Sequence, residues 1–183
     1  MRSILVYADR GPSMPSRIET ALSIARANNG HVTVLVDTPV QRYIAMDPMG
    51  GSYVATDALK QALSEDDAHA ASIEAQLTGQ DVPFDIIRSE AEPVTALAGA
   101  ARLADLAVLS RSSALAGDLA LTARTPVLVL PDQGELKLPL GCAVIAWDGG
   151  NEAALALRSC VPLLAGCKNV AVVTVKEKPE GYP

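Results

Sequence analysis

Aromatic side chains are scarce in this sequence. Phe, Trp and Tyr make up 3% of its 183 residues, with a single Trp and a single Phe. Alanine and valine are abundant instead, so we expect a core of small aliphatic side chains packed closely between helices and a sheet. A hydrophobic fraction of 49% and a charged fraction of 20% are typical of a folded globular protein and exclude an intrinsically disordered chain.

Long apolar runs and paired cysteines are also missing. No stretch reaches the roughly 18–20 apolar residues that a membrane-spanning helix needs. The first apolar run covers only residues 4–8, which is shorter than the apolar region of a secretory signal. Cys142, Cys160 and Cys167 are an odd number without paired spacing, so they predict reduced thiols. We therefore expect a cytoplasmic protein.

The charge balance and the absence of catalytic motifs narrow the functional classes. A formal net charge of -6 and a pI near 4.9 argue against a general nucleic-acid or anionic-membrane binder. The sequence contains no nucleophile elbow, catalytic triad or metal-ligand cluster, so we expect no dedicated enzyme and no metal site. His31 is the first residue of a predicted strand, and His69 is predicted on an exposed helix face. Neither has other potential metal ligands at suitable spacing.

Short apolar strands alternate with alanine-rich stretches at helical spacing. Nearly all-apolar strands must be covered on both faces, which predicts a doubly wound α/β fold with a parallel sheet. Gly30 and Gly79 are predicted to close two of the helices, Gly30 as a left-handed cap. The predicted strands are 3–8, 31–36, 82–88, 106–110 and 127–130, and the predicted helices are 14–28, 57–77, 93–103 and 112–123.

The connection from Thr38 to Thr56 is long for such a fold. Long loops often act as lids or partner surfaces, and a decoration packed against a dimer mate is an equal alternative. Its notable residues are Tyr43, Met46, Met49, Gly50, Gly51 and Tyr53.

The chain begins to repeat itself after residue 140. Residues 143–148 (Ala-Val-Ile-Ala-Trp-Asp) match residues 4–9 (Ile-Leu-Val-Tyr-Ala-Asp) in residue type. The predicted helix 152–165 and strand 170–175 that follow keep the same offset of about 138 to 139 residues from the first copy. This predicts a domain at 1–131, a linker at 132–140 and a partial second repeat at 141–183. Two strands and one helix cannot bury both sheet faces. We therefore expect either a longer tandem protein cut short or a fragment that docks on its own first domain or on another molecule.

The order and spacing of these segments resemble the universal stress protein family. The resemblance implies a five-stranded sheet of order 3-2-1-4-5. It also implies dimerisation, or pairing of tandem domains, through the edge strand nearest the C-terminus of each domain. The segments that carry it are 4–9, 31–36, 104–110, 125–131 and 144–150.

The family divides into members that bind ATP or another adenine nucleotide and members that do not. Binders have a Gly-x-x-Gly loop after the fourth strand, followed further on by Gly-Ser or Gly-Thr. The stretch 110–118, Ser-Arg-Ser-Ser-Ala-Leu-Ala-Gly-Asp, lacks the paired glycines that let backbone N–H groups cradle a phosphate, and Gly117 stands alone in a predicted helix. We expect a homodimeric stress-response binding or signalling protein whose first domain binds no nucleotide and needs no cofactor. The alternatives are an ATP- or AMP-binding protein with slow hydrolysis and a pure oligomerisation scaffold.

A candidate crevice lies at the carboxyl ends of the first and fourth strands, where the winding reverses. By match to the family, Asp9 approaches the nucleoside in binders and Val36 lies on the adenine side. A turn cap is the alternative role for Asp9, and a plain N-cap with a solvated arginine is the alternative to anion binding at 111–113. The predicted crevice residues are Asp9, Arg10, Ser110, Arg111, Ser112 and Ser113.

Overall fold

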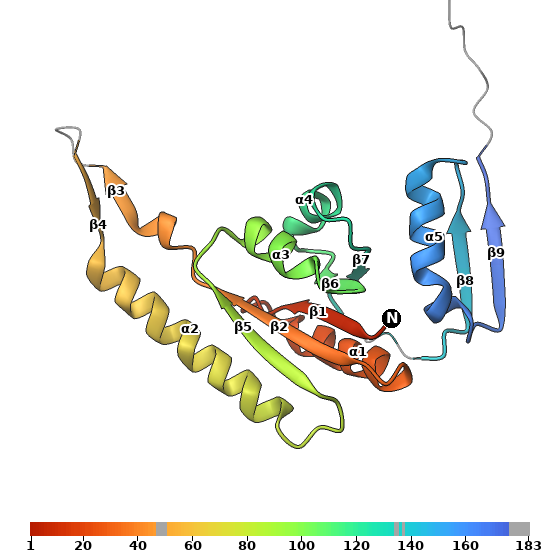
Figure 1. The fold of residues 1–183 in the computed structure, drawn as a ribbon, viewed down its shortest axis with the longest axis horizontal. Helices are drawn as coiled ribbons and strands as arrows, with labels where there is room; N and C mark the ends of the chain where they lie inside the picture. Colours follow the sequence, from red (N-terminus) through yellow and green to blue (C-terminus); the bar gives the residue numbers. More distant parts are fainter. Residues whose placement is uncertain (47–50, 134–135, 137, 176–183) are drawn as a thin grey trace, which may run out of the picture. The chain divides into compact units, whose positions relative to one another are not determined.

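The computed structural model describes residues 1–46, 51–133, 136 and 138–175 (Figure 1). Contacts along the chain divide it into two compact units, Met1–Glu135 and Leu136–Pro183.

Five parallel strands form the sheet of the first unit, in the order β5-β2-β1-β6-β7. This is the order 3-2-1-4-5 of the main strands along the chain, so the predicted α/β fold and strand order are confirmed. The central strand β1 lies with Ser3 opposite His31 on one side and Ile4 opposite Leu106 on the other. The strands are β1 (Ser3–Tyr7), β2 (His31–Asp37), β5 (Phe84–Ser89), β6 (Leu106–Ser110) and β7 (Val127–Leu130).

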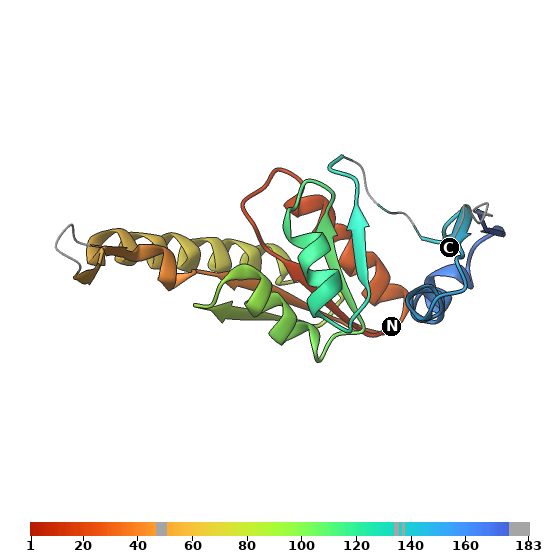
Figure 2. The same cartoon turned by 90° about the horizontal axis from the view of Figure 1, so that it is seen from above.

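Helices cover both faces of this sheet: α1 (Met14–Ala27) and α2 (Thr56–Leu77) lie on one face, and α3 (Pro93–Ala101) and α4 (Leu115–Thr122) on the other (Figures 1 and 2). Side chains alternate between the two faces along each strand. Leu5, for example, packs with Leu97 and Leu119 in one buried cluster. No helix among the described residues is long and apolar enough to cross a membrane.

The end of α1 is closed differently from the prediction. The residue with a left-handed backbone is Asn29, with φ 48°, and not Gly30. Gly30 is needed for close approach, because a Cβ there would lie 2.4 Å from the carbonyl oxygen of Arg2. Gly79, with φ 92°, does follow α2 in the left-handed conformation that favours glycine.

The long connection after β2 is not an irregular loop. It holds the 3-10 helix η1 (Val40–Tyr43) and the strands β3 (Ile44–Met46) and β4 (Ser52–Val54), which pair in an antiparallel ribbon separate from the main sheet. Strands of three residues are too short to give a visible alternation in sequence. Met49 and Gly50 lie outside the described residues.

The second unit consists of β8 (Cys142–Ala146), α5 (Asn151–Leu164) and β9 (Asn169–Val173). Its two strands are parallel, with Cys142 opposite Asn169. This pairing is the counterpart of Ser3 opposite His31, at the sequence offset of the repeat. The shared register supports the repeat, whereas the domain boundaries at 131 and 141 stay a prediction.

We predict that Gly30→Ala destabilises the protein by about 1–3 kcal/mol, because the backbone of Arg2 must move to admit the added methyl group. Gly117→Ala is the matched control. It lies inside α4 with open space around it, so the free energy of unfolding should rise by about 0.5–1 kcal/mol. Urea unfolding of both variants measures the difference; equal effects would contradict the close-approach argument.

Candidate functional site

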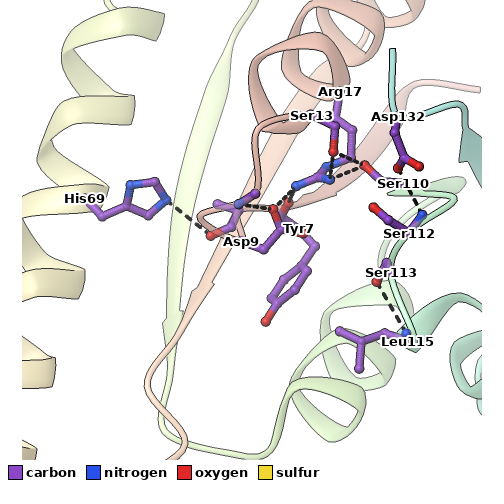
Figure 3. A network of polar contacts seen from close by, with 12 residues as sticks. Tyr7, Asp9, Ser13, Arg17, His69, Ser110, Ser112, Ser113, Leu115 and Asp132 are labelled. Atoms are coloured by element: carbon purple, nitrogen blue, oxygen red, sulfur yellow. Dashed lines mark hydrogen bonds and ion pairs between the residues drawn. The ribbon is translucent and has the colours of Figure 1, made fainter.

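A buried arginine occupies the point where the winding of the sheet reverses. Arg17, in the first turn of α1, is 1% exposed, and its guanidinium reaches the carboxyl ends of β1 and β6 (Figure 3). It donates to Oδ1 of Asp9 at 2.5 Å, to the carbonyl oxygen of Tyr7 at 3.1 Å and to the hydroxyl of Ser110. One side chain therefore ties α1 to both strands that border the predicted crevice.

Two buried serines complete this contact. The hydroxyls of Ser13 and Ser110 lie 2.7 Å apart, and Arg17 also donates to Oγ of Ser13 at 3.2 Å. Ser13 is 5% exposed and Ser110 is 1% exposed. The predicted crevice residue Ser110 therefore lies where expected, but its side chain is enclosed. Nε of Arg17 is buried and has no hydrogen-bond partner among the described residues.

Asp9 has two structural roles at the end of β1. Its carboxylate pairs with Arg17 and also accepts the backbone N–H of Gly11 at 2.9 Å, which closes a tight turn. Asp9 therefore has the turn-cap role that the sequence analysis gave as the alternative to ligand contact. Contact with a ligand stays a prediction, and any ligand would meet a carboxylate whose charge Arg17 already compensates.

Arg10 reaches α2 and not β6. Its guanidinium donates to Glu65 at 2.9 Å and to Asp66 at 2.6 Å. The hydrogen bond from Arg10 lowers the pKa of Glu65. The other carboxylate oxygen of Asp66 accepts the hydroxyl of Thr38 at 2.7 Å. Arg10 thus joins the turn after β1 to α2.

The loop after β6 uses its polar groups within the protein. Hydrogen bonds from the hydroxyl and amide of Ser112 lower the pKa of Asp132. The Arg111 side chain is exposed, as the solvated-arginine alternative expects. Four backbone N–H groups of the loop are engaged: Arg111 to O of Leu130 at 2.7 Å, Ser112 to Oδ1 of Asp132 at 3.0 Å, Ser113 to O of Ser110 at 3.0 Å and Leu115 to Oγ of Ser113 at 3.3 Å.

A second polar group lies at the ends of β1 and β2. The hydroxyl of Tyr7 hydrogen-bonds to Asp37, and burial raises the pKa of both side chains. The nearby guanidinium of Arg42 opposes the rise at Asp37 and pairs with Glu92 at 3.1 Å. These groups brace η1 and the start of α3 against the sheet.

His69 is not on an exposed face, contrary to the prediction. It is half-buried, and its Nε2 reaches from α2 to within 3.3 Å of the carbonyl oxygen of Ala8, just after β1 (Figure 3). His31 lies apart from it and pairs with Asp85 at 3.1 Å. Within the described ranges, no group of three or more His, Cys, Asp or Glu side chains is arranged to hold a metal ion.

Val36, predicted on the adenine side, is 3% exposed and lines a pocket between α2 and the ends of β2 and β5. The volume of this pocket is about 260 Å³. Six of its eight lining residues are polar or charged, and among them Arg88 pairs with Asp67 at 2.5 Å. The remaining lining residues are Thr38, Leu63, Asp66, Ser89 and Glu90.

The second unit repeats the strand-turn-helix geometry without the arginine. Oδ1 of Asp148 accepts the backbone N–H of Gly150 at 2.7 Å, as Asp9 does with Gly11. At the offset of the repeat, the position of Arg17 falls on Leu155 or Ala156. Beside Asp148 lies a pocket of about 650 Å³, lined also by Ala146, Trp147, Ala153, Val173, Thr174 and Val175.

Sequence reasoning missed Arg17, although a signal was present. On α1, Arg17 stands one and two turns before Ala21 and Ile24, both of which are 0% exposed. An arginine on the same helix face as buried apolar residues is expected to pair with a carboxylate inside the fold, because burying an unpaired charge is very unfavourable in free energy.

No protein-family model matches this sequence, and no curated protein is significantly similar to it. Several solved structures have a fold similar to that of this chain. A universal stress protein from Archaeoglobus fulgidus DSM 4304 aligns with 97% of this chain and 67% of its own, at 13% identity and a TM-score of 0.66. The universal stress protein UspA from Lactobacillus plantarum aligns over 70% of this chain and 97% of its own, at 20% identity and a TM-score of 0.56. A protein of the universal stress protein family from Burkholderia pseudomallei aligns over 70% and 95%, at 23% identity and a TM-score of 0.54. The predicted resemblance is therefore confirmed at the level of the fold.

We predict that Arg17→Met lowers the free energy of unfolding by about 3–5 kcal/mol, because it leaves Asp9 and two buried serines without their cationic partner. Arg10→Met is the matched control. Its ion pairs are half-exposed and worth far less, so urea unfolding should shift only slightly. An Arg17 variant as stable as the Arg10 variant would rule out a structural role for the buried pair.

Proposed function

We propose that this chain is a universal stress protein that acts in the cytoplasm as a non-catalytic binding or signalling protein and as a homodimer. We further propose that its first domain binds no adenine nucleotide. The shared fold supports the family assignment. The contact of Arg17 with Asp9 and Ser110 is the observation that carries the proposal about the ligand.

A nucleoside bound where the winding of the sheet reverses, between β1 and β6, needs a free polar group at the end of β1. The Asp9 carboxylate is the group of that kind expected from the family, and here it accepts Arg17 and the amide of Gly11. Ser110, on the opposite wall, is enclosed. Both contacts of Asp9 use Oδ1, and its side chain is 29% exposed, so a ligand that reaches this carboxylate meets it beside the Arg17 guanidinium. A ligand that reaches Ser110 must displace the buried contact with Arg17, which costs binding free energy.

A phosphate group needs several free backbone N–H donors that converge on it. In the loop after β6, the amides of Arg111, Ser112, Ser113 and Leu115 already donate within the protein. The acceptor of the Ser112 amide is the carboxylate of Asp132, which repels a phosphate. These contacts give a physical reason for the missing glycines: the loop is built to hold its own carboxylate.

The proposed dimer forms through the edge of the main sheet. The edge strand β7 pairs only with β6 in the described sheet, and Val129 on it is 44% exposed. An apolar edge strand is a ready template for pairing with another chain. A signalling role then rests on association between chains.

A second candidate function is ligand binding in the second unit. Asp148 has the same turn as Asp9, lacks an arginine partner among the described residues, and borders a larger pocket next to Trp147. An indole beside a carboxylate suits a nucleoside, whose base stacks and whose hydroxyls donate. This pocket favours an adenine-nucleotide protein whose site lies outside the first domain.

Native mass spectrometry with and without ATP separates the two candidates. We predict that no nucleotide is taken up by the wild type, by Asp9→Asn or by Asp148→Asn. Nucleotide that binds to the wild type and is lost only in Asp148→Asn would favour the second candidate. Nucleotide lost only in Asp9→Asn would contradict the closed crevice in the first domain.

A further inference from the structure

We propose that β4 pairs antiparallel with β4 of a second copy of this chain, with the two-fold axis at Tyr53. The product is a four-stranded sheet built from two ribbons, in the order β3-β4-β4-β3. This contact is separate from the proposed edge of the main sheet, so it would join two of the proposed dimers, and it does not depend on the proposed function.

The β3–β4 ribbon stands apart from the main sheet, next to the N-terminal end of α2 (Figures 1 and 2). Its large apolar side chains are exposed: Ile44 49%, Met46 77%, Tyr53 58% and Val54 46%. A two-stranded ribbon is marginally stable in water, and added strands stabilise it. Pairing with another strand would therefore cover exposed apolar side chains of the ribbon and stabilise it.

The hydrogen-bond pattern determines which backbone groups of β4 point outward. The amide of Ala55 donates to the carbonyl of Tyr43 at 2.8 Å, and paired residues alternate between bonded and non-bonded along an antiparallel ribbon. Ala45 and Tyr53 therefore bond to each other. The N–H and C=O groups of Ser52 and Val54 consequently face away from β3.

The outer edge of β4 is open, whereas the edge of β3 is partly used. The amide of Ile44, on β3, already donates to the carbonyl of Gln41 in η1. On β4, the carbonyl of Val54 accepts the Thr56 hydroxyl at 3.2 Å and keeps a second lone pair. No turn, loop or side-chain contact of the described residues engages the Ser52 or Val54 amide.

A second copy fits this edge by charge and by symmetry. Residues 44–46 and 52–54 carry no charge, so two copies of a chain with net charge -6 meet here without like-charge repulsion. The edge has neither lysine, proline nor bulge to guard it. In a two-fold arrangement, Ser52 of each copy lies opposite Val54 of the other, and each donor meets an acceptor. The two Tyr53 rings then form a cross-strand aromatic pair.

Ser52→Pro and Met46→Pro form a matched test, because these residues lie opposite each other in the ribbon. Each variant removes one outward N–H, from β4 and β3 respectively. We expect sedimentation equilibrium of the full chain to show half the wild-type mass for Ser52→Pro and an unchanged mass for Met46→Pro. Unchanged mass in both, equal loss in both, or a monomeric wild type would overturn the proposal. Val129→Lys tests the edge of the main sheet independently.

A cross-link gives a second readout. With Cys142, Cys160 and Cys167 replaced by serine, Tyr53→Cys should form an intermolecular disulfide on mild oxidation, because residues opposite each other in a non-bonded pair have Cβ atoms about 4.5–5.5 Å apart. Ala45→Cys lies on the same face but one strand further from the axis, and should stay monomeric on a non-reducing gel. Equal cross-linking of both variants, or of neither, would contradict the two-fold axis at Tyr53.

Discussion

The ion pair between Arg17 and Asp9 is the contact on which the first domain depends. It joins α1 to the central strand and, through Ser110, to the strand on the other side of the switch point. In an open α/β sheet this point is normally where a ligand fits. Here the buried side chain of Arg17 lies at this point and contacts both bordering strands.

The two units show what this arginine changes. Both have a strand that ends in aspartate, a turn closed by that carboxylate, and a helix that follows. In the first unit the carboxylate is neutralised from within. In the second, leucine or alanine stands at the arginine position, and a pocket borders the carboxylate. The two units thus differ at one position near the start of the helix, which holds arginine in the first unit and leucine or alanine in the second.

Sequence patterns predicted the sheet well because its strands are continuous apolar runs that only a buried parallel arrangement accommodates. They failed where long-range contacts decide. The sequence did not show that the carboxylate partners of Arg10 lie 55 and 56 residues away on α2. His69 was expected to face solvent, but it contacts the carbonyl oxygen of Ala8, 61 residues away in the sequence. The strands β3 and β4 are too short to show a period, and the role of Gly30 depends on the backbone of Arg2.

The most direct test of this account is an NMR measurement of the Arg17 Nε–H in the full-length protein, assigned by its absence in Arg17→Met. This group is buried and has no partner in the part of the chain that the structure describes, whereas the rest of the guanidinium is hydrogen-bonded. The account predicts a resolved signal, slow to exchange with water, that stays in place when ATP is added. A rapidly exchanging signal, or one that ATP shifts, would show that the crevice is open and would contradict the closed first domain.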